Sequence, residues 1–533
     1  MLGLIVRFKY QGVVLIDNSH TPSSNTCQAG TLVSPGLHIS SSVIGEITKL
    51  ANGDTSSLVH PGIKEQLLRS SEFDTDIVVI GAGPGGYYAA IRAAQLGARV
   101  VIIEKGPVGG TCLNVGCIPT KVLLSCVSVL DHIKDASSFG INVSGFDLNI
   151  PAMMERKDSV VKKLVTGVEF LLRKNKIKLV KGTGHIFDPH TVTVENGKKA
   201  ETIKTDKIII ATGSVSALLP LPGLEIGKNV WTSTEALEFS EVPKKMLIIG
   251  AGAIGLESAY TFARMGTEVL VVEMMSQILP AADTETANEL QKGLEAAGIK
   301  FMLNSTVTRA EDTKNGKKAY IKSADKEEAA EFDKVLVAVG RKAIINGLGL
   351  DEVGIANDKR KILVNEYMQT NISNIYAIGD VVGEPMLAHV AWAEGVVAVE
   401  HAMGMDTKMD YNAFPACVYT TPECASVGLT EQQARERYKD VRIGKFGFDH
   451  NGKAMGMGET EGFIKFITEP RYGQILGVHM VGPHTTDLIT QVVQAIKNEL
   501  TVDEIIATIH PHPTLSEVVQ EAAMDTQGRA IHK

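Results

Sequence analysis

Two copies of one glycine-containing pattern limit the folds open to this chain more than any other feature. In the first copy, an apolar run from Ile77 to Ile80 leads into the turn Gly81-Ala-Gly-Pro-Gly-Gly86. An alanine-rich stretch follows, and then a second apolar run that ends at Glu104. This order of residues predicts a strand, a tight turn, a helix that begins at the turn, and a second strand. We therefore expect a doubly wound α/β domain.

The same residues predict the ligand of this domain. Gly81, Gly83 and Gly86 would permit a tight turn and let the backbone approach a pyrophosphate, whose charge is attracted by the helix N-terminus. Glu104, 23 positions after Gly81, is placed to accept hydrogen bonds from ribose hydroxyls. With its full strand–turn–helix–strand context, the motif indicates a dinucleotide site.

The second copy begins with a predicted strand at 246–249 and runs through Gly250, Gly252 and Gly255 to Glu273, at a constant offset of 169 positions. Two complete units predict two bound dinucleotides. Glu273 would repel a 2′-phosphate, and the residues after it, Met-Met-Ser, include no arginine to hold one. The second site is therefore predicted to prefer NAD over NADP.

A cysteine pair lies between the two copies, in the run Gly-Gly-Thr-Cys-Leu-Asn-Val-Gly-Cys-Ile-Pro-Thr-Lys at 109–121. Cys112 and Cys117 are close enough in sequence to form a small-ring disulfide, and a helix N-terminus there would favour a thiolate. Lys121 would lie on the same helical face as Cys117. Inert buried thiols or half of a metal site are the alternatives, but no further Cys or His stands nearby at metal-ligand spacing. A redox disulfide is the interpretation we favour.

This run resembles the active-site signature of the disulfide-bridged flavin reductases, and within them most closely that of the dihydrolipoamide dehydrogenases. The resemblance extends over about residues 72–533, and its one departure in the motif is Thr120, where the family usually has Ser. It implies FAD on the first dinucleotide unit and NAD on the second.

The resemblance also implies the catalytic residues. Lys121 would stabilise charge on the reduced flavin, and Glu257 would orient Lys121. In the C-terminal run His-Pro-His-Pro-Thr-Leu-Ser-Glu, His512 would be the acid–base and Glu517 the carboxylate that orients it. By itself, the same run fits a capping box of Thr514 and Glu517 with a proline at the helix start. The implied catalytic set is Cys112, Cys117, Lys121, Glu257, His512 and Glu517.

A larger set of residues is implied to contact the two cofactors. An aspartate after a strand, as at Asp380, is equally often a plain cap, so its predicted role depends on the resemblance. The implied cofactor-binding residues are Gly81, Gly83, Gly86, Glu104, Thr111, Lys121, Gly184, Thr212, Gly213, Ser214, Asp380, Met386, Leu387, Ala388, His389, Gly250, Gly252, Gly255, Glu273, Val307 and Gly340; no metal ligand is expected.

A chain of 533 residues is too long for one core. We predict an α/β protein with two Rossmann-like domains, for FAD and NAD, an α+β C-terminal dimerisation domain and a small N-terminal appendage. The predicted segments are 1–70 (N-terminal extension), 71–218 (FAD-binding, first part), 219–341 (NAD-binding), 342–410 (return to the FAD-binding part) and 411–533 (dimerisation).

The first seventy residues have no counterpart in the family pattern, and three interpretations stay open. The Ser/Thr/Gly-rich tract at 20–58 is compatible with a small β-rich module, a transit peptide or a disordered tail. We favour the β module, in which Lys49 within the sequence Glu-Ile-Thr-Lys is a candidate modification site.

Charge and composition narrow the partners. A net charge of −8 does not favour nucleic acid or an anionic membrane as a partner. No uncharged apolar run is long enough to span a bilayer. Six cysteines in so long a chain are atypical of a disulfide-stapled secreted protein, which favours a reducing compartment. We expect a cytoplasmic protein, with an organelle matrix left open.

The resemblance predicts an NAD-dependent dihydrolipoyl dehydrogenase that acts as a homodimer on lipoylated carrier domains of 2-oxoacid dehydrogenase or glycine-cleavage complexes. Sister reductases with an additional C-terminal redox pair are disfavoured because no cysteine follows Cys424. Glutathione-type reductases are disfavoured by Glu273. A non-catalytic docking subunit is the alternative from another class, and the intact set of candidate catalytic residues argues against it.

Overall fold

The computed structural model describes residues 5–7, 13–15, 73–197, 199–324 and 326–533, and the chain divides into two compact units, 1–69 and 70–533. Within residues 1–69, strands β1 (Ile5–Arg7) and β2 (Val13–Leu15) pair antiparallel. The other predictions for the N-terminal extension, including the candidate at Lys49, lie outside the described residues.

Residues 70–533 begin with a sheet whose central strands β3 and β4 are parallel and largely buried. Its order is β5-β4-β3-β8-β7-β6, with β19 on the other side of β8. The second half of the long strand β8 pairs with β3, and its first half turns away to pair antiparallel with β7. The strands are β3 (Thr75–Ile80), β4 (Val100–Glu104), β5 (Lys178–Lys181), β6 (Thr183–Asp188), β7 (Thr191–Asn196), β8 (Lys199–Ile210) and β19 (Ile375–Ala377).

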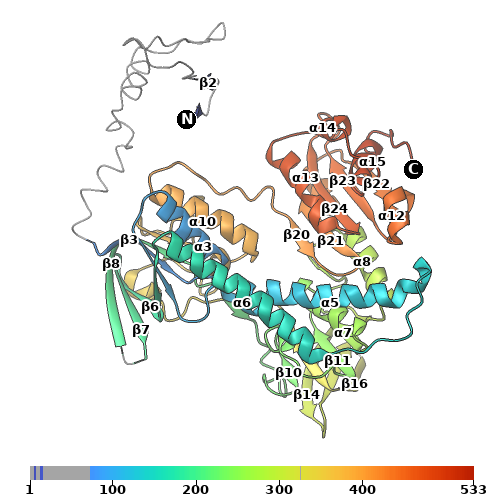
Figure 1. The fold of residues 1–533 in the computed structure, drawn as a ribbon, viewed down its shortest axis with the longest axis horizontal. Helices are drawn as coiled ribbons and strands as arrows, with labels where there is room; N and C mark the ends of the chain where they lie inside the picture. The colour runs from blue at the N-terminus through green and yellow to red at the C-terminus, as the bar shows by residue number, and fades with distance from the viewer. Residues whose placement is uncertain (1–4, 8–12, 16–72, 198, 325) are drawn as a thin grey trace, which may run out of the picture. The chain divides into compact units, whose positions relative to one another are not determined.

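Helices cover this sheet and supply the loops that carry the candidate site. Helix α3 packs along α10, and Figure 1 shows the two side by side, α3 in blue and α10 in orange. The long helices α5 and α6 also contact each other. The helices are α3 (Pro84–Gln95), α4 (Gly110–Val115), α5 (Cys117–Asp135), η3 (Ala136–Phe139), α6 (Ile150–Lys174), η5 (Gly379–Val382) and α10 (Ala388–Ala402).

A second parallel sheet repeats this design with the order β10-β17-β11-β12-β13. A three-stranded antiparallel sheet, β14-β15-β16, follows β13, and a short pair, β9 with β18, lies at the two crossings between the sheets. The elements are β9 (Ser214–Ser216), β10 (Val230–Trp231), η4 (Glu235–Leu237), β11 (Lys245–Ile249), α7 (Ala253–Arg264), β12 (Glu268–Val272), α8 (Thr284–Ala296), β13 (Lys300–Met302), β14 (Ser305–Asp312), β15 (Lys317–Ser323), β16 (Lys326–Phe332), β17 (Lys334–Val337), β18 (Arg341–Ala343) and α9 (Leu350–Val353).

The C-terminal part is an antiparallel sheet, β20-β21-β24-β23-β22, covered by helices. The two parallel sheets and this α+β part confirm the predicted fold class. The elements are β20 (Ala416–Val418), β21 (Glu423–Gly428), α11 (Glu431–Arg437), β22 (Arg442–Gly447), η6 (Phe448–His450), α12 (Gly452–Met457), β23 (Phe463–Thr468), β24 (Ile475–Gly482), α13 (Thr485–Lys497), α14 (Val502–Ala507) and α15 (Glu517–Asp525).

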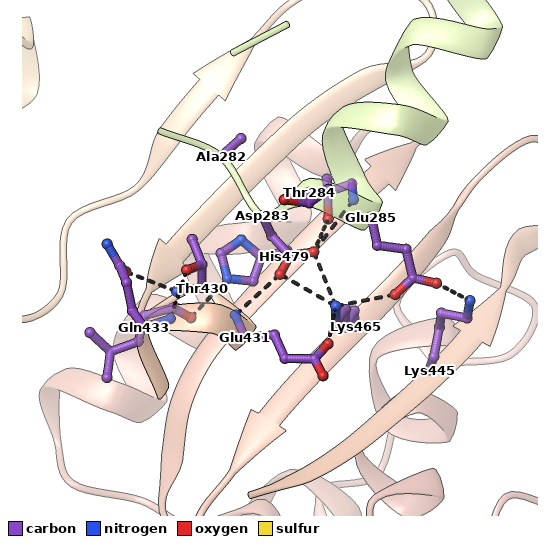
Figure 2. Close-up of polar contacts among 12 residues, drawn as sticks. Ala282, Asp283, Thr284, Glu285, Thr430, Glu431, Gln433, Lys445, Lys465 and His479 are labelled. Carbon is purple, nitrogen blue, oxygen red and sulfur yellow. Dashed lines mark hydrogen bonds and ion pairs between the residues drawn. The ribbon is translucent and has the colours of Figure 1, made fainter. Parts of the chain in front are cut away.

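A buried lysine joins the second parallel sheet's domain to the C-terminal part. Lys465 in β23 is 1% exposed, and Figure 2 shows its ammonium group among three carboxylates. Its Nζ lies 3.1 Å from Asp283 and 3.1 Å from Glu285, at the start of α8, and 2.7 Å from Glu431 in α11. Asp283 also accepts a hydrogen bond from the backbone N–H of Glu431. Because a buried charge must be paired, this cluster ties α8 to the C-terminal sheet.

Among the described residues, one helical stretch, Gly110–Phe139, is long and apolar enough to cross a membrane by length and composition alone. Its contacts are those of a core helix. Leu123 and Val127 are buried in the same apolar cluster as residues of α7. Further along, Asp131 accepts a hydrogen bond from Tyr260 at 2.7 Å and pairs with Arg264. The stretch is therefore packed into the folded unit by both apolar and polar contacts.

Candidate active site

The turn after β3 has no room for side chains. Gly81 has a φ of +107°, and a Cβ there would lie 2.3 Å from the carbonyl oxygen of Ala211. A Cβ on Gly86 would lie 1.9 Å from the carbonyl oxygen of Gly81. Helix α3 begins at Pro84 with Gly83 as its N-cap and with no side chain capping it. A bare helix N-terminus behind a glycine turn fits the pyrophosphate of FAD.

Glu104 at the end of β4 has a structural use that the sequence analysis missed. One carboxylate oxygen accepts a hydrogen bond from the backbone N–H of Ala82 and the other from Gly106, both at 2.7 Å. These bonds hold the glycine turn against the loop after β4. Each oxygen has a second lone pair, so the predicted contact with ribose is compatible with this geometry and stays a prediction.

The second dinucleotide-binding unit, from β11 to Glu273, repeats these contacts. Gly250 has a φ of +105°, and a Cβ on Gly255 would lie 2.1 Å from the carbonyl oxygen of Gly250. Glu273 accepts hydrogen bonds from the backbone N–H groups of Ala251, at 2.8 Å, and Met275, at 2.9 Å. The turn therefore fits a second pyrophosphate, that of the pyridine nucleotide.

The two cysteines lie at the junction of α4 and α5. Cys112 is inside α4, and Cys117 is the first residue of α5, where the helix dipole favours a thiolate. Both are free thiols. A hydrogen bond from Cys112 is the largest effect on Cys117 and, with the charge of Lys121, outweighs burial and lowers the pKa of Cys117 to about 7. The same contact and burial raise the pKa of Cys112. The pair is thus arranged with Cys117 as the thiolate and Cys112 as the thiol.

Three parts of the chain meet at Lys121. Its Nζ donates to both carboxylate oxygens of Glu257, each at 2.8 Å, and Glu257 is only 6% exposed on α7. The ammonium group also lies 4.1 Å from the centre of the Tyr419 ring, and the backbone N–H of Tyr419 donates to Glu257. Tyr419 follows β20 and was not predicted. The structure therefore holds Lys121 from the second parallel sheet's domain and from the C-terminal part together.

A second polar group gathers at the crossing of β9 and β18. Arg341 donates from Nε to the hydroxyl of Ser214 at 2.7 Å, and that hydroxyl donates to Asp380. Arg341 also lies 3.5 Å from Asp380. Thr212 donates to the carbonyl oxygen of Ile344 at 2.8 Å. Thr212, Ser214 and Asp380 were predicted as flavin contacts. Arg341 was missed, although a lone arginine directly after Gly340 was a usable signal.

The other predicted cofactor contacts take part in fewer side-chain hydrogen bonds than Ser214 does. Helix α10 begins at Ala388, and His389 hydrogen-bonds to the carbonyl oxygen of Pro415 at 2.8 Å. A Cβ on Gly184 would lie 3.0 Å from Ile80 in β3. Val307 lies in β14 and is buried in an apolar core. Gly213 and Gly340 have positive φ. The hydroxyl of Thr111 lies 3.5 Å from Arg341. Met386 and Leu387 come directly before α10, and Leu387 is the N-cap of that helix.

His512 and Glu517 form a pair at the surface of the C-terminal part. Nδ1 of His512 lies 2.8 Å from Glu517, and the imidazole is 79% exposed. Burial raises the pKa of the Glu517 carboxyl, but hydrogen bonds from Thr514 and His512 outweigh burial, so this pKa is lowered. Within the described part of the chain, Glu517 is the side chain that hydrogen-bonds to this imidazole. The cysteine pair lies on other elements, α4 and α5.

The capping-box prediction for this run is wrong. Helix α15 begins at Glu517, not next to Pro513, and Ser516 is its N-cap. Glu517 does accept a hydrogen bond from the backbone N–H of Thr514, which is half of such a box. The Thr514 hydroxyl, however, donates to the carbonyl oxygen of Pro511. The carboxylate is therefore shared between Thr514 and His512 and does not begin a helix at Thr514.

No group of three or more His, Cys, Asp or Glu side chains that could hold a metal ion occurs among the described residues.

The fold and this arrangement define a class of protein, a flavoprotein disulfide reductase with a pyridine-nucleotide site. Residues 75–395 match the pyridine nucleotide-disulphide oxidoreductase family, and residues 414–523 match the dimerisation domain of that family. The chain therefore belongs to the pyridine nucleotide-disulphide oxidoreductase family, whose members of this kind use FAD and NAD.

Individual relatives narrow the comparison. The chain is 43% identical to a dihydrolipoyl dehydrogenase of Bacillus subtilis over 458 residues, which cover 86% of this chain and 99% of the relative. It is 43% identical to the mitochondrial dihydrolipoyl dehydrogenase of Pisum sativum over 477 residues, 88% of this chain and 95% of the relative. Among solved structures, the Cu(II) complex of the HOCl-induced flavoprotein disulfide reductase RclA from Escherichia coli superposes with a TM-score of 0.76 at 27% identity, over 84% of this chain and 98% of that one.

Proposed function

We propose that the chain is a dihydrolipoyl dehydrogenase, which oxidises dihydrolipoyl groups to lipoyl groups and passes the electrons to NAD. The observation that carries the proposal is the thiol pair at the junction of α4 and α5, with Cys117 held as a thiolate and Lys121 one turn further along α5. The identity of 43% to curated dihydrolipoyl dehydrogenases over most of the chain supports the same substrate.

The dithiol step follows from the two cysteine pKa values. Starting from the Cys112–Cys117 disulfide, His512 takes a proton from one substrate thiol, and the resulting thiolate attacks the sulfur of Cys112. The sulfur–sulfur bond breaks, and Cys117, the better leaving group because its pKa is lower, departs as a thiolate.

The second substrate sulfur loses its proton to solvent and attacks the substrate sulfur in the mixed disulfide. The lipoyl ring closes, Cys112 is released and takes the proton held by His512, and Cys117 stays ionised. The substrate has lost two electrons and the enzyme disulfide has gained them. FAD, when bound, would be the carrier through which this electron pair passes from the dithiol to NAD.

The remaining residues act by position and charge. Lys121, held by Glu257 and Tyr419, keeps a positive charge beside Cys117. Glu517 orients the imidazole of His512. The match to a dimerisation domain supports a homodimer. In that dimer we propose that His512 of one subunit serves the cysteine pair of the other, because its imidazole is exposed on the C-terminal part that matches the dimerisation domain.

The partners we propose are lipoylated carrier domains of 2-oxoacid dehydrogenase or glycine-cleavage complexes. Relatives include bacterial and mitochondrial forms, and we propose the cytoplasm for this chain. The second site is proposed to take NAD, because Glu273 directly follows β12 and would repel a 2′-phosphate.

The test compares two cysteines of the same helix. Cys117→Ser should abolish NAD reduction by dihydrolipoamide while FAD stays bound, and Cys126→Ser, nine positions further along α5, should keep turnover. Turnover is followed as NADH absorbance with NAD and NADP in parallel. Unchanged turnover in Cys117→Ser would contradict the mechanism, and a preference for NADP would contradict the role of Glu273.

A further inference from the structure

Three aromatic side chains on α3 and α10 form a cluster that the proposed reaction does not use. The rings of Tyr88 and Trp392 are stacked, with centroids 5.0 Å apart and planes 16° apart. Tyr87 lies 5.4 Å from Tyr88, in a tilted arrangement. Tyr87 is buried, whereas Tyr88 is 40% exposed and Trp392 is half-buried. An aromatic stack with one open face is a surface that can bind a ligand.

Close backbone packing places this cluster on α10 and α3 together. A Cβ on Gly85 would lie 3.1 Å from the carbonyl oxygen of Ala391, the residue before Trp392. A Cβ on Gly395 would lie 2.8 Å from the carbonyl oxygen of Gly85. Glycines at these two positions let the helices touch, so the side chains at the crossing are held against each other.

The same helix N-terminus touches the element that carries the cysteine pair. A Cβ on Gly110 would lie 2.7 Å from the Cα of Gly83, so the start of α4 is in contact with the start of α3. Cys112 follows Gly110 by two residues. The pKa of Tyr87 is raised to about 12, chiefly by burial and then by the charges of Tyr88 and Cys112, with a smaller contribution from Cys117. Tyr87, in the first turns of α3, is therefore within electrostatic reach of Cys112 in the neighbouring α4.

Trp392 is held against Tyr88 by ring stacking. Its indole N–H is buried and interacts with the Tyr87 oxygen, which lowers the pKa of Tyr87 against the larger effect of burial. Trp392 therefore contacts both tyrosines and fixes the position of the exposed ring of Tyr88.

We propose that the stacked pair Tyr88 and Trp392 is the surface along which the hydrocarbon arm of the lipoyl group lies when its sulfur atoms reach Cys112. This inference rests on the proposed function and names the residues that select its substrate. A flexible alkyl chain has no polar group to guide it, and contact with an aromatic face removes it from water. Tyr88 would contact the arm, and Trp392 would position Tyr88.

The experiment measures KM for dihydrolipoamide and for dithiothreitol, a dithiol without the arm. Tyr88→Ala is expected to raise KM for dihydrolipoamide about tenfold more than KM for dithiothreitol, with kcat for dihydrolipoamide little changed. Tyr88→Phe, which keeps the ring, should behave as the unmodified protein. Tyr472→Ala, at an exposed tyrosine in the β23–β24 turn, is the matched control and should change neither KM.

A binding measurement gives a readout apart from turnover. The chain has two tryptophans, and in the FAD-containing Trp231→Phe variant Trp392 is the remaining one. Oxidised lipoamide should quench its fluorescence, and Tyr88→Ala in that background should weaken the quenching constant. Equal KM ratios in Tyr88→Ala and the unmodified protein, with no quenching, would overturn the inference while leaving the proposed function intact. Absence of dihydrolipoamide turnover in the unmodified protein would overturn both.

Discussion

The two dinucleotide-binding units share one backbone design and differ in the side chains that it presents. Glu104 and Glu273 make matching hydrogen bonds, one to the residue after the first glycine and one to the loop behind the strand. Two positions after the third glycine, the first unit carries Tyr88, 40% exposed, and the second carries Glu257, 6% exposed. The same place in the repeat therefore serves two purposes.

The difference comes from what packs on each helix. In the first unit α10 lies along α3, and Tyr88 stacks on Trp392 with one face open. In the second unit α5 lies against α7, and a carboxylate at this position meets Lys121. An open site at this position can select a substrate, and a buried one can hold a charge. The repeat supplies the position, and the neighbouring helix decides its use.

The largest effects should come from the glycines that close each turn. Gly86→Ala would push a Cβ to 1.9 Å from a backbone oxygen in the first unit, and Gly255→Ala to 2.1 Å in the second. We expect Gly86→Ala to purify without FAD and without activity. Gly255→Ala should keep FAD and lose more than about a hundredfold in NAD reduction, since a backbone clash costs several kcal/mol. FAD absorbance and NADH formation are the measurements.

Gly167→Ala is the control, because this helical glycine of α6 has open space where the Cβ would be placed. It should bind FAD normally and turn over normally. A yellow, active Gly86→Ala protein would mean that the first turn is not the flavin site. Loss of FAD in Gly255→Ala would mean that the two units are not separate in function.

A second difference between the units is the anchor at Lys465, which ties the second unit to the C-terminal part. Lys465→Met should lower stability by about 3–5 kcal/mol, because it leaves the buried carboxylate of Asp283 without its cationic partner. The loss should appear first as faster amide exchange in β11 and β12 of the second unit, before β3 and β4. Lys292→Met, which removes an exposed lysine of α8 paired with Glu289, should be nearly neutral in the same urea titration. Equal amide-exchange rates in the two units of Lys465→Met would show that Lys465 does not hold them differently.

The smallest effect concerns the influence of Glu257, in the second dinucleotide-binding unit, and Lys121 on the pKa of Cys117. The thiolate form of Cys117 should increase as pH rises through about 7 in the reduced enzyme. Since Lys121 lowers this pKa and Glu257 raises it, the midpoint of iodoacetamide alkylation should move above 7 in Lys121→Met and below 7 in Glu257→Gln. The rate is followed at fixed reagent concentration from pH 5 to 9. Shifts of opposite sign would show that the cross-unit pair does not control this thiol.

Some parts of the site were predictable and others were not. The glycine turns and the position of Cys117 at a helix start depend on a few neighbouring residues, and the structure has them where the pattern indicates. The Lys121–Glu257 contact, 136 positions apart, was expected only through the family resemblance. Tyr419 and Arg341 were missed because each acts through a partner from a distant segment. The capping box at Thr514 failed because a proline-rich turn competes with the helix for the same groups.

The sequence by itself determined the two repeated units, the spacing of the thiols and the acid that favours NAD, because these features follow from residues within about one strand–helix–strand unit. Only the tertiary structure decided which helix covers each unit, and with it the burial of Glu257, the stacking of Trp392 on Tyr88 and the enclosure of Lys465, which lies 182 positions from Asp283. Local pattern sets the backbone, whereas burial and charge pairing depend on chains of contacts between distant segments, and these exist only after the sheets have packed.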